Sequence, residues 1–414
     1  MNINVFGATV SALVTAACLA ETGNQVTLIG QLPKEMVEPG LKKLLNKQLN
    51  LGTLIVSDKH QVDADFHIFS YGDGDCNQAL ELTEQLAQEA QEHSTLVIRS
   101  NFSVHIMRQI IATARMPILI NPDFAPEGSA IQAFQRPDRI IIGATDGQAI
   151  KRFRRLMAPF NRFRDTIIQM SPESAILTKY ATNVLIATRI SLMNELALVA
   201  EQMHADIEEV RQGMGSDHRI GFSYLYPGVG FGGAYLERDL ERVQALIDQT
   251  GSGENLLKAV HNINQQQKEL LFRKLWSHYE CNLEQKKVAI WGISYKPNTN
   301  SIEGAPSLVM IQALLHQGCE LHLFDPKLDD LFQHWLSTQL LPEQAARVTL
   351  HSAMYDCLDQ ADALCVLTEW KAFWNPDFTQ IRQRMRQPLI LDGRNLYDKT
   401  DLLESGFVYY GVGR

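Results

Sequence analysis

Short apolar runs alternate with amphipathic segments along the amino-terminal part of the chain. Residues 3–6 and 25–29 are typical of buried strands, and the apolar segment 11–22 between them is typical of a packed helix. Strand, helix and strand in this order open a βαβ unit. The same alternation predicts further strands at 66–70, 95–98, 118–120 and 140–142, with helices at 77–92 and 147–157.

Residues from about 171 to 280 carry helical rather than strand periodicity. Ser171-Pro-Glu-Ser174 is a good helix start, because it offers a capping serine, a proline at the first helical position and an early acid. One apolar stripe follows at spacings of three and four, formed by Leu177, Tyr180, Val184, Ala187, Ile190 and Met193. We expect this helix to continue to residue 203, with further helices at 236–248 and 253–278.

A second βαβ unit opens near the carboxyl end of the chain. It combines a strand at 288–292, a helix at 308–316 and a strand at 320–324, and later strands are predicted at 363–367 and 389–391. The pattern therefore predicts the α/β class, with two α/β domains around a helical middle. We place the three domains at 1–165, 166–282 and 283–414.

Composition narrows the class of protein without naming a function. The 414 residues are 45% hydrophobic and 21% charged, which is ordinary for a soluble globular protein. The formal net charge of −9 argues against a nucleic-acid-binding surface, although it leaves room for a local basic pocket.

The spacing of the cysteines and the hydropathy of the chain indicate the cellular compartment of the protein. The six cysteines are scattered in a way that fits neither a metal motif nor a disulfide framework, so a reducing cytoplasm is expected. Segment 11–20 follows a strand and lacks a preceding basic region, which favours a buried helix over a signal peptide. No apolar run suggests a membrane span, and no membrane partner is expected.

The most distinctive stretch is Tyr224-Leu-Tyr-Pro-Gly-Val-Gly-Phe-Gly-Gly-Ala-Tyr-Leu-Glu-Arg-Asp239. Four glycines lie within six residues, at Gly228, Gly230, Gly232 and Gly233. Glycine allows positive φ and close approach to the main chain, and a row of backbone N–H groups can cradle phosphate oxygens. The alternative is an ordinary surface turn.

This stretch resembles the active-site loop of the UDP-glucose/GDP-mannose dehydrogenases, which reads roughly PGxGxGGSCxxKD. Further motifs of that family occur in its order along nearly the whole chain. They are Asn121-Pro-Asp-Phe-Ala-Pro-Glu127-Gly, Arg136-Pro-Asp-Arg139, Lys179-Tyr-Ala-Thr-Asn183, Asn194-Glu195, Lys296-Pro-Asn-Thr299, Ala305-Pro-Ser307, Asp325-Pro326, Leu367-Thr-Glu-Trp370 and Asp392-Gly-Arg-Asn395. The resemblance implies two Rossmann-like α/β domains joined by a central helical dimerisation region, and hence a homodimer.

The resemblance also implies a reaction and residues for it. Members of the family oxidise the C6 alcohol of a nucleotide sugar such as UDP-glucose twice, with two NAD⁺, through an enzyme thioester. In this chain Lys179 would stabilise oxyanions, Asn183 would position a water or an oxyanion, and Asp239 would act as base. Glu127 would line the same cavity.

On the nucleotide-sugar side, the resemblance assigns the diphosphate to the loop of Gly228, Gly230, Gly232 and Gly233. Arg219 matches the arginine that the family sends across its dimer interface, and Lys296 and Arg394 match basic residues near the sugar nucleotide. Arginine suits such oxygens because its planar fork can donate two hydrogen bonds. Tyr224 and Phe231 could pack against the ligand or belong to the core.

The cofactor side departs from the family pattern. The G-x-G-x-x-G fingerprint falls on Gly7, Thr9 and Ala12, with Val10 between them, and the position of the ribose-binding acid falls near Gly30. Residues 101–105 and Glu303 also differ from the family. We expect a Rossmann-like domain in which Gly7, Val10 and Ala12 are the residues that would bind NAD, but with much reduced affinity.

The nucleophile differs as well. The family cysteine position carries Tyr235, and no cysteine lies between Cys76 and Cys281. A phenol with a pKa of about 10 is a poor substitute for a thiolate. The leading hypothesis is a non-oxidising nucleotide-sugar-binding protein, a pseudoenzyme serving polysaccharide biosynthesis. The alternatives are a two-electron oxidoreductase that uses Tyr235 and Lys179 as an acid/base pair, and a conventional dehydrogenase with a rearranged nucleophile.

Overall fold

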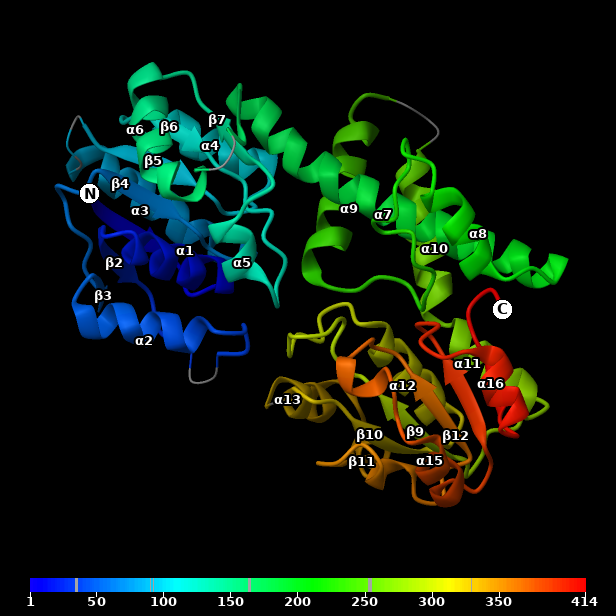
Figure 1. The fold of residues 1–414 in the computed structure, drawn as a ribbon. Helices are drawn as coiled ribbons and strands as arrows, with labels where there is room; N and C mark the ends of the chain where they lie inside the picture. Colours follow the sequence, from blue (N-terminus) through cyan, green and yellow to red (C-terminus); the bar gives the residue numbers. More distant parts are fainter. Residues whose placement is uncertain (34–35, 90, 92, 163–164, 252–254, 329) are drawn as a thin grey trace. The chain divides into compact units, whose positions relative to one another are not determined.

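The structure is a computed structural model that describes all residues except 34–35, 90, 92, 163–164, 252–254 and 329 (Figure 1). The chain divides into two compact units, Met1–Tyr180 and Ala181–Arg414. Each unit is built around one sheet whose strands run almost entirely parallel. The two units are described in turn.

The first unit contains an eight-stranded sheet in the order β3-β2-β1-β4-β5-β6-β7-β8. Adjacent strands are parallel except for β6 and β7, which are antiparallel. The strands are β1 (Asn2–Phe6), β2 (Gln25–Ile29), β3 (Leu54–Ser57), β4 (Phe66–Phe69), β5 (Thr95–Ile98), β6 (Ile118–Ile120), β7 (Ile140–Gly143) and β8 (Ile167–Met170). This layout confirms the predicted Rossmann-like α/β class.

Helices cover both faces of this sheet (Figure 1). They are α1 (Val10–Glu21), α2 (Leu41–Leu51), α3 (Cys76–Glu89), α4 (Val104–Thr113), α5 (Ala130–Gln135) and α6 (Gly147–Met157), with short 3-10 turns η1 (Asp73–Asp75) and η2 (Ala158–Phe160). Alternate residues of β1 pack into different hydrophobic cores on the two faces of the sheet. Ile3 and Val5 pack with α1, whereas Phe6 packs on the opposite face with residues of α3 and α4.

Two strands of this sheet were not predicted, and both lie at its edges. In β3 only Leu54 is buried, and in β8 no residue is fully buried. Edge strands bury little apolar surface, so the hydropathy pattern that marks a central strand is missing from them.

The second unit begins within the long helix α7 (Pro172–Met203), whose extent matches the prediction. It continues with α8 (Ile207–Gly215), α9 (Ala234–Asp248), α10 (Leu256–Lys268) and α11 (Leu270–His278). The single helix predicted at 253–278 is wrong, because the chain breaks at Glu269 between α10 and α11. Residues 253 and 254 of that prediction lie outside the described residues.

Helix α7 is long and apolar enough to cross a membrane by length and composition alone, contrary to the sequence expectation. One face of the helix carries the buried side chains Asn183 and Asn194, which are hydrogen-bonded inside the second unit. One helix of this length and composition is weak evidence for a membrane span.

A six-stranded parallel sheet in the order β11-β10-β9-β12-β13-β14 completes the second unit. Its strands are β9 (Lys287–Trp291), β10 (Glu320–Phe324), β11 (Val348–Leu350), β12 (Ala363–Val366), β13 (Leu389–Asp392) and β14 (Val408–Tyr410). The helices are α12 (Pro306–His316), α13 (Asp330–Gln339), α14 (Pro342–Ala345), α15 (Phe378–Arg384) and α16 (Lys399–Glu404), with 3-10 turns η3 (Asp356–Leu358) and η4 (Lys371–Phe373). The unpredicted strands, β11 and β14, are again the two edges.

Candidate functional site

The glycine-rich loop between α8 and α9 is held in place by amide side chains from two helices. The Gly228 N–H donates to Asn194 Oδ1 of α7 at 2.8 Å, and Gln267 Nε2 of α10 donates to the Gly228 carbonyl at 2.7 Å. Asn264 of α10 accepts from the Phe231 N–H at 2.8 Å and donates to the Phe231 carbonyl at 3.1 Å. Because all three amide side chains are buried, the loop has a fixed shape.

Two glycines of the loop are needed for both conformation and space. Gly230 has φ +89°, and a Cβ there would lie 2.8 Å from Asn264 Oδ1. Gly233 has φ +84°, and its Cβ would lie 2.7 Å from the Tyr295 ring. Other residues would be strained at both positions.

Three backbone N–H donors of the glycine-rich loop have partners inside the protein. The N–H groups of Gly228 and Phe231 donate to asparagine side chains, and the Gly233 N–H donates to the Glu303 carbonyl at 2.8 Å. These three donors are therefore already used inside the protein. A phosphate could not use these three N–H groups without breaking their present hydrogen bonds.

Two predicted catalytic residues, Asn183 and Asp239, lie in contact in the second unit. Asn183 Nδ2 of α7 donates to Asp239 Oδ2 of α9 at 2.6 Å. Asp239 is fully buried, and Arg242 Nη1, one turn along α9, lies 3.2 Å from its other oxygen. Burying a carboxylate is costly without hydrogen-bonding and oppositely charged partners, and Asn183 together with Arg242 provides them.

Tyr235 lies in the first turn of α9, directly after Gly233 and Ala234, and is 42% exposed. Negative charge is favoured near the amino end of a helix. A phenolate at this position would therefore be stabilised by the helix dipole. The side chain is accessible at the position where the resemblance expects the nucleophile.

The cysteines of the second unit do not offer a replacement near the loop. Burial raises the pKa of Cys18, Cys319 and Cys357 to about 12 and also raises that of Cys365, so these four remain protonated thiols at neutral pH. Cys281 is exposed but comes shortly before β9, at the amino edge of the sheet. The loop instead contacts residues that follow β9 and β13, at the carboxyl edge.

Basic residues of the second unit gather around the same loop. A Cβ on Gly228 would lie 3.3 Å from Arg394 Nη1, so the Arg394 guanidinium packs against the loop. Arg394 Nε donates to the Leu367 carbonyl at 2.8 Å and lies 3.1 Å from Glu369 Oε2. Lys296 follows Tyr295, the residue packed on Gly233, and its Nζ lies 5.3 Å from the Tyr295 ring centroid.

Glu303, which departs from the family pattern, forms an ion pair with Arg238 of α9. The guanidinium compensates the added carboxylate charge. The backbone carbonyl of Glu303 accepts the Gly233 N–H, so this residue also anchors the loop. The unusual carboxylate of Glu303 is therefore neutralised by Arg238 within the same site.

Arg219 and Tyr224 lie apart from this cluster within the chain. The Arg219 side chain is 77% exposed and pairs with Asp217 at 2.6 Å, a contact that lowers the pKa of the Asp217 carboxyl. Tyr224 has φ +59° and is 48% exposed. Neither residue is placed against the loop by the protomer alone.

In the first unit, the fingerprint residues lie at the carboxyl edge of the sheet. Gly7 has φ +124°, and a Cβ there would lie 2.4 Å from the Ser70 carbonyl. Thr9, at the position of the second glycine, caps α1: its Oγ1 accepts the Ala12 N–H at 3.1 Å and donates to the Ser70 carbonyl at 2.8 Å. Val10 begins α1 and Ala12 is fully buried.

Gly30 has a structural reason to lack a side chain. A Cβ on Gly30 would lie 2.5 Å from the Gly7 carbonyl oxygen, which is closer than real contacts allow. The position where the fingerprint expects a ribose-binding acid is therefore closed by the backbone of the turn. In this conformation the domain has no space for that carboxylate.

The remaining predicted catalytic residues, Glu127 and Lys179, belong to the first unit. Glu127 is half-buried in the loop after β6, and Lys179 Nζ lies 5.2 Å from the ring centroid of Phe124.

The structure also shows residues that the sequence analysis missed. Asn264, Gln267 and Tyr295 shape the glycine-rich loop. The available signal was a pair of amides three residues apart, Asn264 and Gln267, in register with Leu257 and Val260 on one face of the helix. Among the described residues, no group of three or more His, Cys, Asp or Glu side chains could hold a metal ion.

Comparison with known proteins agrees with this architecture. Three models of the UDP-glucose/GDP-mannose dehydrogenase family match: the NAD binding domain at residues 1–161, the central domain at 173–266 and the UDP binding domain at 289–399. A UDP-glucose 6-dehydrogenase of Pseudomonas aeruginosa is 38% identical, with 100% of this chain and 98% of the relative covered.

Two further relatives give the same picture. A UDP-glucose 6-dehydrogenase of Bacillus subtilis is 31% identical, over 100% of this chain and 98% of the relative. The solved structure of a UDP-glucose dehydrogenase from Pyrobaculum islandicum shares the fold with a TM-score of 0.86 at 24% identity, covering 100% of this chain and 97% of that one. The chain therefore belongs to the UDP-glucose/GDP-mannose dehydrogenase family.

Proposed function

We propose that this protein binds a nucleotide sugar of the UDP-glucose type without oxidising it through an enzyme thioester. The observation that carries this proposal is the position of Tyr235. It stands accessible at the start of α9, where the family places its cysteine. A thioester requires a sulfur atom. The four buried cysteines are protonated, the Cys76 thiol of the first unit donates to the Asp73 carbonyl at 3.1 Å, and Cys281 lies at the opposite edge of the sheet.

Binding of the nucleotide sugar is supported by the second unit. Arg394 packs on the glycine-rich loop, and Lys296 lies beside the tyrosine that packs on Gly233. Guanidinium and ammonium groups suit diphosphate oxygens. The UDP binding domain of the family matches the same part of the chain, and the relatives above are named as UDP-glucose 6-dehydrogenases.

Weak binding of NAD is the second part of the proposal. The first unit has the fold of an NAD binding domain. Gly7, Val10 and Ala12 are the residues that would lie against the pyrophosphate of the cofactor, which would supply hydride acceptance when bound. Thr9 occupies the position of the second glycine, and Gly30 offers no carboxylate to the ribose.

A second candidate function is a single two-electron oxidation. The accessible Tyr235 at a helix amino end favours it, since the helix dipole and the cation that the resemblance assigns to Lys179 would both stabilise a phenolate. Asn183 and Asp239 would then hold the reacting oxygen or a water. The product would be an aldehyde rather than an acid.

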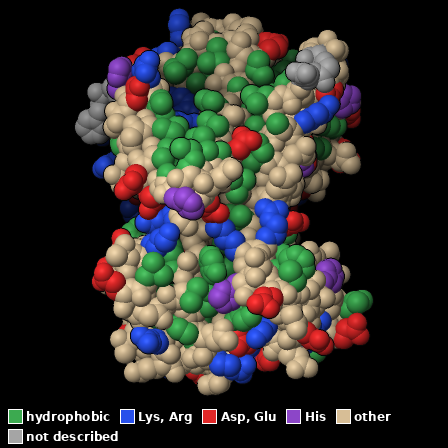
Figure 2. All heavy atoms as spheres, turned by 90° about the vertical axis from the view of Figure 1, so that its right-hand side faces the viewer, with side chains coloured by type: hydrophobic (Ala, Val, Ile, Leu, Met, Phe, Trp, Pro, Cys, Tyr) green, Lys and Arg blue, Asp and Glu red, His purple; other side chains and the backbone are tan. Residues whose placement is uncertain are grey.

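A homodimer in the cytoplasm is part of the proposed function. Exposed apolar side chains follow one another along α7 at spacings of seven, seven and four residues: Leu185, Leu192, Val199 and Met203. Figure 2 shows hydrophobic side chains gathered on the face of the second unit that carries the helices. A second copy covering this stripe would also bring its exposed Arg219 toward the partner's ligand.

The deciding experiment is calorimetric titration of UDP-glucose, followed by NAD⁺ into the UDP-glucose-saturated protein. We expect UDP-glucose to bind and NAD⁺ to give no heat up to millimolar concentration. Micromolar NAD⁺ binding with aldehyde formation would establish the two-electron alternative, and absence of UDP-glucose binding would refute the proposal altogether.

The variant Tyr235→Cys provides the matched chemical test. It restores the family nucleophile, and Cys281 serves as an internal control because it is already exposed. If the variant with excess NAD⁺ forms acid from UDP-glucose while the natural protein does not, the missing thiol is what blocks the reaction.

A further inference from the structure

A cavity of the first unit lies between the loop after β6, helix α5 and the segment before β7. Its volume is about 410 Å³. Its charged lining residues are Arg99, Arg136, Arg139, Asp123 and Asp138, so guanidinium groups outnumber carboxylates by three to two. A cavity of this size can hold a small organic molecule.

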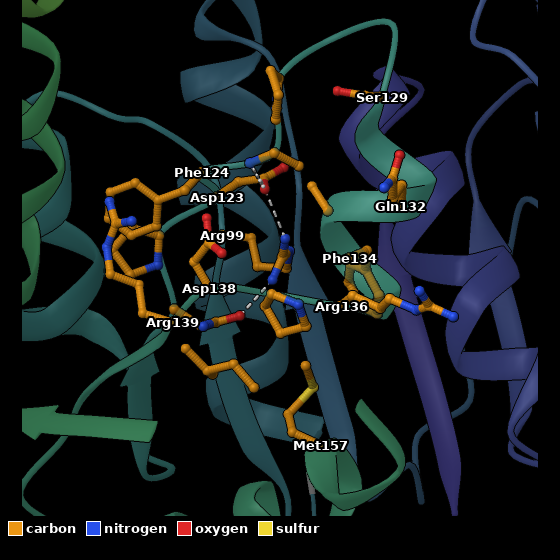
Figure 3. A pocket seen from close by; sticks show the side chains of 17 residues that line it. Arg99, Asp123, Phe124, Ser129, Gln132, Phe134, Arg136, Asp138, Arg139 and Met157 are labelled. Atoms are coloured by element: carbon orange, nitrogen blue, oxygen red, sulfur yellow. Dashed lines mark hydrogen bonds and ion pairs between the residues drawn. The ribbon is translucent and has the colours of Figure 1, made fainter. Parts of the chain in front are cut away.

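Aromatic and apolar side chains form the rest of the wall. Figure 3 shows Arg139 beside Phe124 on one side, Arg99 in the centre, and Phe134 with Arg136 on the other side. The Arg139 guanidinium carbon lies 4.2 Å from the Phe124 ring centroid, and that of Arg99 lies 5.2 Å from the Phe134 ring centroid. Flat cationic and aromatic surfaces therefore alternate around one space.

The three guanidinium groups differ in how many ion pairs and hydrogen bonds they form within the protein. Arg99 is buried, pairs with Asp123 at 3.0 Å and donates to Asn121 Oδ1. Its Nε has no acceptor in the described part of the protein. Arg136 and Arg139 form no ion pair with any described residue, so their charge is open to a ligand.

We propose that this pocket binds a small organic anion, with one carboxylate or phosphate group carried on a flat apolar body. Arg139 and Arg136 would receive the anionic group, because guanidinium forks donate paired hydrogen bonds to such oxygens. Phe124, Phe134 and Met157 would contact the apolar body. The pocket belongs to the first unit, whereas Arg394 and Lys296, which were assigned to the diphosphate of the nucleotide sugar, belong to the second unit.

The pocket has a physical link to the predicted catalytic lysine. A smaller cavity lined by Lys179 shares Arg99 and Asp123 with it, so this ion pair forms a common wall. Phe124 carries Arg139 on its ring and also lies 5.2 Å from Lys179 Nζ. An anion that draws Arg99 or Arg139 toward itself would change the surroundings of Lys179.

The test is ligand-observed NMR titration of the full-length protein with four probes: benzoate, phenyl phosphate, benzamide and inorganic phosphate. We expect benzoate or phenyl phosphate to bind at least tenfold more tightly than benzamide, which has the same shape without charge. Tighter binding of benzoate identifies a carboxylate ligand, and tighter binding of phenyl phosphate identifies a phosphate ester. Equal binding of benzamide, or of inorganic phosphate, overturns the proposal.

Variants locate the bound probe. Arg139→Gln and Arg136→Gln should each weaken binding about tenfold, whereas Arg108→Gln, on the exposed face of α4, should leave it unchanged. Arg136 is exposed, so its variant keeps the test valid if Arg139→Gln fails to fold. Unchanged binding in both pocket variants refutes the assignment. UDP-glucose titrated into the same variants reports the proposed function separately.

Discussion

Three buried amide side chains fix the conformation of the glycine-rich loop. Asn264 uses both ends of its side chain on Phe231, and Asn194 and Gln267 hold the two sides of Gly228. An amide can donate and accept at once, which suits a loop whose backbone groups point in both directions. The shape of the site therefore depends on residues that no ligand needs to touch.

Asn264→Ala should lower the free energy of unfolding by about 2–3 kcal/mol, because it leaves a buried donor and a buried acceptor of Phe231 unpaired. UDP-glucose affinity should fall with it. Chemical denaturation and calorimetry measure the two effects. Asn262→Ala, on the exposed face of the same helix, is the matched control and should change stability by less than about 0.5 kcal/mol.

Gly30→Asp should not restore a ribose-binding acid. Its Cβ would meet the Gly7 carbonyl oxygen at 2.5 Å, so we expect a loss of about 1–3 kcal/mol of stability and no gain in NAD⁺ affinity. Gly147→Ala, where an added Cβ meets nothing within 4 Å, is the control. If the Gly30→Asp variant is stable and binds NAD⁺ more tightly than the natural protein, the turn can open.

At the scale of elements, the start of α1 has been rebuilt as a capped helix. Thr9 satisfies the Ala12 N–H and also ties the turn to the Ser70 carbonyl at the end of β4. A threonine cap stabilises a helix, whereas a glycine at this position lets the pyrophosphate approach the backbone. In this chain the turn stabilises the helix, and the proposed function predicts that it accepts the pyrophosphate less readily.

Thr9→Gly should therefore tighten NAD⁺ binding while costing about 1 kcal/mol of stability, mainly through the lost hydrogen bond from Thr9 Oγ1 to the Ser70 carbonyl. Calorimetric titration with NAD⁺ and thermal unfolding test both parts. Asp146→Gly removes the cap of α6, whose side chain accepts the Ala149 N–H at 2.6 Å, and should cost stability without changing NAD⁺ affinity. If Thr9→Gly does not raise NAD⁺ affinity, the weak NAD⁺ binding must be due to other positions, such as Gly30 or residues 101–105.

At the scale of the whole molecule, the two units carry different buried polar groups and should respond differently to pH. In the first unit, burial and the neighbouring His60 lower the pKa of His67 to about 4, from 6.5. Its Nδ1 lies 3.1 Å from Asn4 Nδ2, which fits a neutral ring that accepts a hydrogen bond. The ring is fully buried, and both influences on its pKa act against the protonated form.

The unfolded state therefore binds one more proton than the folded state between pH 6.5 and about 4. The stability due to neutral His67 is complete above pH 6.5 and falls as the pH drops through this window, by roughly 3 kcal/mol in total. Denaturation of the natural protein and of His67→Gln at several pH values measures the slope. Equal slopes in the two proteins would show that other groups govern acid stability.

Much of the fold was predictable because burial leaves a pattern in the sequence. Central strands such as β1, β4 and β12 are buried on both faces and mostly apolar, and the helices next to them have clear periodicity or caps. The edge strands β3, β8, β11 and β14 were missed, since strands with little buried surface have no such pattern. The break between α10 and α11 was missed because Glu269 is not a helix breaker by itself.

The sequence by itself determined the family motifs, the α/β class and the absence of a cysteine at Tyr235, because these depend on residue identity and spacing along the chain. Only the tertiary structure decided that the N–H groups of Gly228, Phe231 and Gly233 are already used, that Gly30 is closed by Gly7, and that Glu303 is balanced by Arg238. Each of these depends on contacts between residues distant in the chain. The physical reason is that a hydrogen-bond donor, a charge or a space for a side chain is available only if no other part of the fold occupies it.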